Sequence, residues 1–290
     1  MISCSALSIG PAASLALSGA VALRVHSAFP SVLNLELEGS GRLVSLRAVR
    51  GGGLPHEVVL DRAEALEGWE LSAGARAEVT EGAIRLPAPS GILVVDLRGA
   101  ARLPRRTLPP IVHLGAAHRA CTQDLAARQE GCELRIDALR RECGAATAMG
   151  ERLRGAALDL AAAARGPLMP LRRAVAALVG LGPGLTPAGD DFLCGLLAAA
   201  RAADPALITA LGDAVEASLG RTTSIGAFLL RWAVEGFWPT ALVDLAEGLA
   251  GEREAEALAG LAELCQLGHS SGCDLATGFL FGLGSLVPPA

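Results

Sequence analysis

The hydrophobic period changes once along this chain of 290 residues, and that change limits the folds that the chain can form. From about Ala20 to Ala101 apolar and polar residues alternate, as in "VLNLELEG", "AIRLP" and "GILVVDL", with Gly, Pro and Ser between the segments. Such alternation is typical of short strands in a small antiparallel barrel or sandwich. The stretch "RLPRRTLPP" (Arg102 to Pro110) ends this pattern, because paired prolines stop both sheet and helix.

Beyond this linker the period becomes helical, with Leu and Ala dominating and Gly or Pro at the ends of the segments. The expected helices are 116–143, 147–165, 168–180, 187–203, 205–219, 223–236, 239–250, 253–266 and 272–286. The predicted fold class is therefore α+β. Residues 1–105 are interpreted as a β-rich scaffold or docking domain, and residues 111–290 as an α-helical domain that carries the glycine-rich motifs described next.

Composition excludes several functions. The net charge of −5 gives no sign of a nucleic-acid partner, and the absence of lysine excludes a Walker-type phosphate loop. No apolar run of about 20 residues is free of charge and proline, so a membrane span is not expected. The cysteines have no zinc spacing, and free thiols favour a reducing cytoplasm. They are Cys4, Cys121, Cys132, Cys143, Cys194, Cys265 and Cys273.

One stretch, "GLGPGLTPAGDDFLCG" (180–195), places a glycine loop in front of a predicted helix. Thr186 suits the N-cap and Pro187 the first helical position. A helix start behind a loop without side chains is a ready anion site, which makes Gly182, Gly184 and Gly189 candidate ligand contacts.

The two aspartates at the start of this helix complicate the anion site. Asp190 and Asp191 favour the helix dipole, but they would repel a phosphate unless a cation or an arginine intervenes. A purely structural alternative stays open: the aspartates belong to an ordinary first helical turn, and Gly195 only permits close packing of the helix.

A second stretch, "GHSSGCDLATGFLFG" (268–282), repeats the pattern G-x-D-x-x-x-G-[LF]-L that begins at Gly189. The repeat predicts two similar helix starts, packed through Gly195 and Gly278, with Asp191 and Asp274 near each other. Paired carboxylates in one cleft hold Mg²⁺ in some proteins and divide acid and base roles in others. The alternative is a packing repeat whose aspartates only cap helices.

The remaining candidates are polar residues next to these helix starts. Ser270, Ser271 and Gly272 open the second helix, and His269 just before them is either an acid–base group or an ordinary hydrogen-bonded histidine. In "RTTSIGAFLL", Thr222 or Thr223 can cap the next helix. Arg221 is then an anion clamp or a plain surface arginine.

Together the three stretches resemble a bacterial family formerly of unknown function, the AllH-type subunit of oxamate carbamoyltransferase. The β-rich half matches only in general pattern. The resemblance implies a role in allantoin or purine-nitrogen catabolism, in which an assembly of several different subunits converts oxalurate and phosphate to oxamate and carbamoyl phosphate. It also implies partner subunits and a small anionic substrate, namely phosphate, carbamoyl phosphate, oxamate or oxalurate.

The sequence thus supports a carbamoyltransferase subunit, with two alternatives open: a non-catalytic scaffold subunit, or a stand-alone metal-dependent hydrolase. No cofactor is fixed by the sequence, although Mg²⁺ is a candidate. The catalytic candidates are Asp190, Asp191, His269 and Asp274, and the ligand-binding candidates are Gly182, Gly184, Thr186, Gly189, Arg221, Thr222, Ser270, Ser271 and Gly272.

Overall fold

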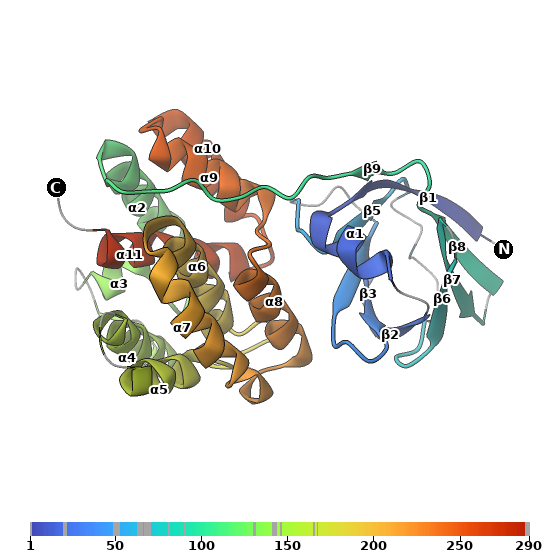
Figure 1. Cartoon of the computed structure of the whole chain (residues 1–290), viewed down its shortest axis with the longest axis horizontal. Helices are drawn as coiled ribbons and strands as arrows, with labels where there is room; N and C mark the ends of the chain where they lie inside the picture. The colour runs from blue at the N-terminus through green and yellow to red at the C-terminus, as the bar shows by residue number, and fades with distance from the viewer. Residues whose placement is uncertain are drawn as a thin grey trace. The chain divides into compact units, whose positions relative to one another are not determined.

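A computed structural model divides the chain into two compact units, Met1–Arg105 and Arg106–Ala290 (Figure 1). The structure describes residues 2–19, 22–48, 53–62, 66, 71–80, 82–89, 91–129, 132–140, 144–145, 147–164, 166 and 168–287. Cys143 lies outside these residues. Strands fill the first unit and helices the second, so the predicted α+β class is confirmed. Among the described helices, none is long and apolar enough to cross a membrane.

In the first unit, eight of the described strands close into a barrel. They are β1 (Ile2–Ile9), β2 (Ala22–Ala28), β3 (Val32–Leu37), β4 (Leu43–Arg47), β5 (Glu57–Leu60), β6 (Arg76–Thr80), β7 (Ala83–Ala88) and β8 (Gly91–Asp96). Their order is β5-β4-β3-β2-β6-β7-β8-β1, and β1 pairs back with β5. The pairs β1–β8 and β4–β5 are parallel and the others antiparallel. The barrel is therefore mixed, where the alternation of residues predicts only antiparallel strands.

Residues 2–17 complete the barrel, although the strand pattern is recognisable in the sequence only from about Ala20. Strand β1 buries Cys4, Ala6 and Ile9, and because two of these three side chains are small, its apolar alternation is weaker than that of the other strands. Helix α1 (Pro11–Leu17) buries Ala12, Ala13, Ala16 and Leu17 and packs against β4 and β5. A short strand β9 (Ala101–Arg102) pairs with β1 in parallel.

The second unit contains helices α2 to α11. Their bounds are α2 (Ala116–Arg128), α3 (Ile136–Leu139), α4 (Ala148–Ala163), α5 (Leu168–Leu178), α6 (Ala188–Ala203), α7 (Pro205–Glu216), α8 (Ser224–Glu235), α9 (Thr240–Ala250), α10 (Glu254–Leu264) and α11 (Ser271–Leu286), with a 3₁₀ turn at Leu219–Arg221 before α8. The expected helix 116–143 is wrong. The buried amide of Gln129 ends α2 by donating to the Leu134 carbonyl and accepting from the Ile136 N–H, which replaces helical hydrogen bonds.

Helix α6 lies at the centre of this unit and is buried on nearly all sides, with α11 packed along it (Figure 1). A methyl group at Gly195 would overlap the carbonyl oxygen of Leu275, and one at Gly278 would overlap that of Phe192. The two helices therefore approach as closely as their backbones allow. This reciprocal contact confirms the predicted packing through Gly195 and Gly278.

Candidate functional site

The starts of α6 and α11 meet at a pair of hydroxyl groups. Thr186, just before α6, and Ser271, the first residue of α11, lie with their side-chain oxygens 2.9 Å apart. Each helix start also buries one aspartate: Asp191 and Asp274 are 4% and 1% exposed. The two lie near enough that the charge of Asp274 acts on Asp191.

Hydroxyl groups donate hydrogen bonds to these two carboxyls. Asp191 accepts hydrogen bonds from Ser271 and Thr186, and Asp274 accepts one from Ser270. Oδ2 of Asp191 and Oδ1 of Asp274 have no hydrogen-bond partner in the part of the chain that the structure describes. Each residue therefore carries one buried oxygen available to a proton, a water molecule or a ligand.

Burial raises the pKa of both carboxyl groups. Burial, and then the charge of Asp274, raise the pKa of Asp191 well above its usual range. Burial raises the pKa of Asp274 to about 8. With a pKa of about 8, Asp274 is mostly protonated at neutral pH, and burial also disfavours ionisation of Asp191.

Asp190 has a different role from its neighbour. One of its oxygens accepts the Gly180 N–H at 2.8 Å, and the other accepts the hydroxyl of Thr222. Burial raises the pKa of Asp190, while these two hydrogen bonds oppose the rise. Both oxygens are thus used within the chain, and Asp190 joins the start of the glycine loop to the segment before α8.

The same backbone arrangement precedes both helix starts. The amide of Gly189 donates to the Leu181 carbonyl at 2.9 Å, and the amide of Gly272 donates to the Leu267 carbonyl at 3.0 Å. In each case the acceptor lies three residues beyond the end of the preceding helix, α5 or α10. These two amides are therefore engaged within the chain, and a ligand would contact other groups of the helix starts.

The glycine loop and Arg221 lie side by side at the surface. Gly182 and Gly184 have φ angles of 124° and 92°, and Gly184 is exposed. The backbone of Arg221 contacts Gly180 at one end of the loop, and Thr223 donates a 2.5 Å hydrogen bond to the Leu185 carbonyl at the other. The exposed Arg221 is thus anchored beside the loop, as an anion clamp would need to be.

One capping prediction needs correction, and one open alternative is decided. Helix α6 begins at Ala188 with Pro187 at the N-cap position, so Thr186 is not the cap, and its hydroxyl meets Ser271 instead. Thr223, and not Thr222, caps α8 through the N–H of Gly226. The hydroxyl of Thr222 is free for this reason to bond Asp190.

His269 and Ser270 lie in a pocket of about 370 Å³ beside the start of α11. His269 is exposed. Arg128 and the thiols Cys132, Cys265 and Cys273 also line this pocket. His269 and Ser270 therefore both line this pocket, and the hydroxyl of Ser270 also bonds Asp274.

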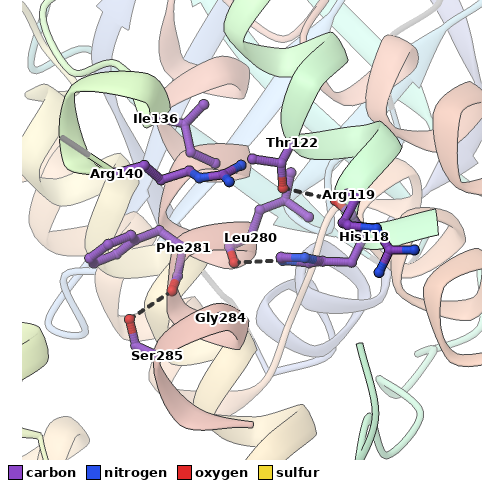
Figure 2. Close-up of a pocket in the computed structure, with 9 residues that line it drawn as sticks. All are labelled: His118, Arg119, Thr122, Ile136, Arg140, Leu280, Phe281, Gly284 and Ser285. Atoms are coloured by element: carbon purple, nitrogen blue, oxygen red, sulfur yellow. Dashed lines mark hydrogen bonds between the residues drawn. The ribbon is translucent and has the colours of Figure 1, made fainter. Parts of the chain in front are cut away.

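A second cavity, of about 290 Å³, lies at the other end of α11 and contains none of the predicted site residues (Figure 2). His118, whose Nε2 lies 3.0 Å from the Leu280 carbonyl, lines it. The other polar side chains around it are those of Arg119, Thr122, Arg140 and Ser285. Burial lowers the pKa of His118. Sequence reasoning missed these residues because they come from separate segments that share no motif.

The described side chains give limited support for a metal site. Among the described residues, no group of three or more His, Cys, Asp or Glu side chains is arranged to hold a metal ion. Mg²⁺ binds through few protein oxygens, together with water and substrate. Asp191 and Asp274 would be its two protein ligands in this unit.

Two family models match the chain. One is described as oxamate carbamoyltransferase subunit AllH and matches residues 178–283; the other is described as AllH family N-terminal domain and matches residues 5–102. The chain belongs to the AllH family. This confirms the resemblance carried by the three motifs, and the 178–283 match contains every predicted site residue of this AllH-family chain. No solved structure matches the chain significantly.

Proposed function

We propose that this AllH-family chain is a subunit of an enzyme that converts oxalurate and phosphate to oxamate and carbamoyl phosphate in the degradation of allantoin, and that it binds an anionic ligand where α6 and α11 begin. The family description supports the enzyme class and the need for partner subunits. The observation that carries the site is the buried carboxyl pair, Asp191 and Asp274, with one unpartnered oxygen each.

Neutral carboxyls remove the main obstacle to an anion at this place. Ionised aspartates would repel phosphate, but burial raises the pKa values of Asp191 and Asp274 and so reduces the negative charge there at neutral pH. Two helix N-termini converge at the Thr186–Ser271 contact, and each adds partial positive charge. The electrostatic balance at the hydroxyl pair therefore favours an anion.

The same groups suit the proton transfer that the reaction requires. When a phosphate oxygen attacks the carbamoyl carbon of oxalurate, the bond to the oxamate nitrogen breaks and that nitrogen takes up a proton. Asp191 is hydrogen-bonded to Ser271 and Thr186, which are only partly buried. We assign Asp191, whose unpartnered Oδ2 can hold the proton, as the proton source, and the two hydroxyls as the groups that orient its carboxyl.

Arg221 supplies the positive charge in this proposal. Its exposed side chain begins from a backbone fixed against Gly180, so the guanidinium can contact a ligand held over the glycine loop. Arginine binds phosphate and carboxylate through two parallel hydrogen bonds. Asp190 acts indirectly, because it holds Gly180 and the segment before α8 together.

The proposal is tested by thermal unfolding of the purified chain with phosphate, carbamoyl phosphate, oxamate or oxalurate, each with and without Mg²⁺. A ligand at about 100 times its dissociation constant adds about 2.7 kcal/mol to the free energy of unfolding, which raises the midpoint by several degrees. We expect a rise with at least one of these anions. Asp191→Asn and Arg221→Ala are expected to abolish it.

Arg172→Ala is the matched control, because Arg172 is an exposed arginine on α5, away from the three motifs. It is expected to keep the full shift. No shift with any of the four anions would contradict a ligand site on this chain and favour the scaffold subunit. Turnover of oxalurate by the isolated chain that depends on Mg²⁺ would favour the hydrolase.

A further inference from the structure

Three thiols gather at the pocket beside the start of α11, and nothing in the proposed carbamoyl transfer uses them. The structure describes six cysteines, all unpaired, and Cys132, Cys265 and Cys273 share this one pocket. Cys265 directly follows α10, and Cys273 lies in the first turn of α11.

The three sulfur atoms form a hydrogen-bonded row with Cys273 in the middle. The Cys132 thiol donates to Cys273, and the Cys273 thiol donates to Cys265. The backbones also touch, because a methyl group at Gly272 would lie 3.1 Å from Cα of Cys265. Cysteines on adjoining backbones with sulfurs in hydrogen-bond contact need only small side-chain rotations to form a disulfide.

The environment distinguishes Cys265 from the other two thiols. The hydrogen bond from Cys273 lowers the pKa of Cys265, burial opposes this, and the Arg128 guanidinium lowers it further. The pKa of Cys132 is raised by its hydrogen bond to Cys273 and by burial. For Cys273, the hydrogen bond from Cys132 lowers the pKa, but the bond to Cys265 and burial outweigh it and bring it to about 12. Thiolate is the reactive form of cysteine, so Cys265 is the nucleophile of the row.

We propose that Cys265 and Cys273 are a redox-reactive pair that hydrogen peroxide converts to a disulfide. The Cys265 thiolate attacks one peroxide oxygen, the O–O bond breaks, and the leaving hydroxide takes up a proton to become water. Cys265 is then a sulfenic acid. The Cys273 sulfur attacks the Cys265 sulfur, the S–S bond forms, and a second water leaves. One peroxide accepts two electrons, and two thiols lose them.

The disulfide would tether the end of α10 to the start of α11. Asp274 follows Cys273 directly, so the restraint falls on the helix turn that holds one of the two buried carboxyls. The pair is defined by sulfur contacts and pocket lining alone. It therefore stands or fails independently of the carbamoyl transfer proposed above.

Peptide mapping of the full chain identifies the pair directly. The reduced protein is treated with hydrogen peroxide, remaining thiols are alkylated after denaturation, and trypsin is added. Residues 254–290 contain no lysine or arginine, so Cys265 and Cys273 fall in one peptide, whereas Cys132 falls in peptide 129–135. We expect peptide 254–290 to be unalkylated and lighter than its reduced form by two hydrogen atoms. A link between the two peptides, or complete alkylation, overturns the proposal.

Variants then test the assigned roles. Cys265→Ser and Cys273→Ser are expected to abolish the intrapeptide disulfide, whereas Cys121→Ser, at a buried thiol of α2, leaves it unchanged. Arg128→Gln keeps both cysteines and is expected to slow disulfide formation several-fold, because the charge that favours the Cys265 thiolate is gone. A rate equal to that of the unmodified chain would remove Cys265 as the nucleophile.

Discussion

Asp191 and Asp274 are carboxyl groups whose pKa values burial raises, and neither forms an ion pair with a cation among the described residues. The cost of ionising them inside the protein must therefore appear in the stability of the chain. In the unfolded chain an aspartate has a pKa of about 3.9, whereas Asp274 in the folded chain has one of about 8. Below the lower value both states hold the proton, and the contribution of the group to folding is fully present.

Between these two pKa values the unfolded chain has lost the proton that the folded chain still holds, so the free energy of unfolding falls as the pH rises. The slope for one proton is at most about 1.4 kcal/mol per pH unit. Asn has no proton to lose, so we expect Asp274→Asn to flatten this fall. Urea unfolding of the unmodified chain and of Asp274→Asn, from about pH 5 to about pH 8, measures the two slopes.

An exposed carboxyl gives the matched control for this comparison. Asp213→Asn on α7 is expected to follow the unmodified chain across the whole pH range. Equal slopes for the unmodified chain and Asp274→Asn would show that Asp274 is already ionised at low pH. In that case the neutral carboxyl pair, and its tolerance of a bound anion, would have to be abandoned.

At the scale of the element, the α6–α11 contact depends on two glycines that face each other's backbones. We expect Gly195→Ala and Gly278→Ala each to destabilise the chain by at least about 3 kcal/mol, because the added methyl meets a carbonyl oxygen on a helix with no room to move. Gly155→Ala on α4 is the control, since nothing lies within 4 Å of its added methyl.

Alanine is the better helix former at an unobstructed site, so Gly155→Ala should stabilise by about 0.5–1 kcal/mol. Chemical denaturation of the three variants separates the two effects. If Gly195→Ala behaves like Gly155→Ala, the helices do not pack through this glycine and the carboxyl pair is not held as described.

The sequence predicts these helices well because each is marked by local signals. Gly and Pro at the ends fixed most helix bounds to within three residues, and the repeat beginning at Gly189 and Gly272 predicted the α6–α11 packing. The errors arise where a side chain outside the helix determines where the helix ends or how it is capped. Gln129 ends α2 by bonding to residues beyond it, and Ser271 draws Thr186 away from the capping role.

For the whole molecule, the change of hydrophobic period predicted a β-rich unit and a helical unit. The local pattern did not predict which strands pair to close the barrel. Closure of the barrel depends on β1 pairing with both β5 and β8, which lie far along the chain and leave no periodic signal. The site shows the same limit. The residues of the carboxyl pair were identifiable, but their shared burial, and so their protonation, follows only from the folded chain.

The two units have separate hydrophobic cores, since the buried residues of the barrel and those of the helices form distinct clusters. A cut between Arg105 and Arg106 leaves β9 with the barrel. It leaves Arg106 with its partners on α9, Asp244 at 2.6 Å and Glu247 at 2.9 Å. Residues 106–290 alone should therefore fold and keep any anion-dependent shift of the full chain.

Calorimetry makes this last prediction quantitative. The full chain is expected to unfold in two transitions, and the fragment 106–290 in one, at the midpoint of its counterpart in the full chain. A single transition for the full chain, together with an unfolded fragment by circular dichroism, would mean that the helices need the barrel to fold. The anion site would then have to be tested only in the complete chain, because its helix starts would not form without the first unit.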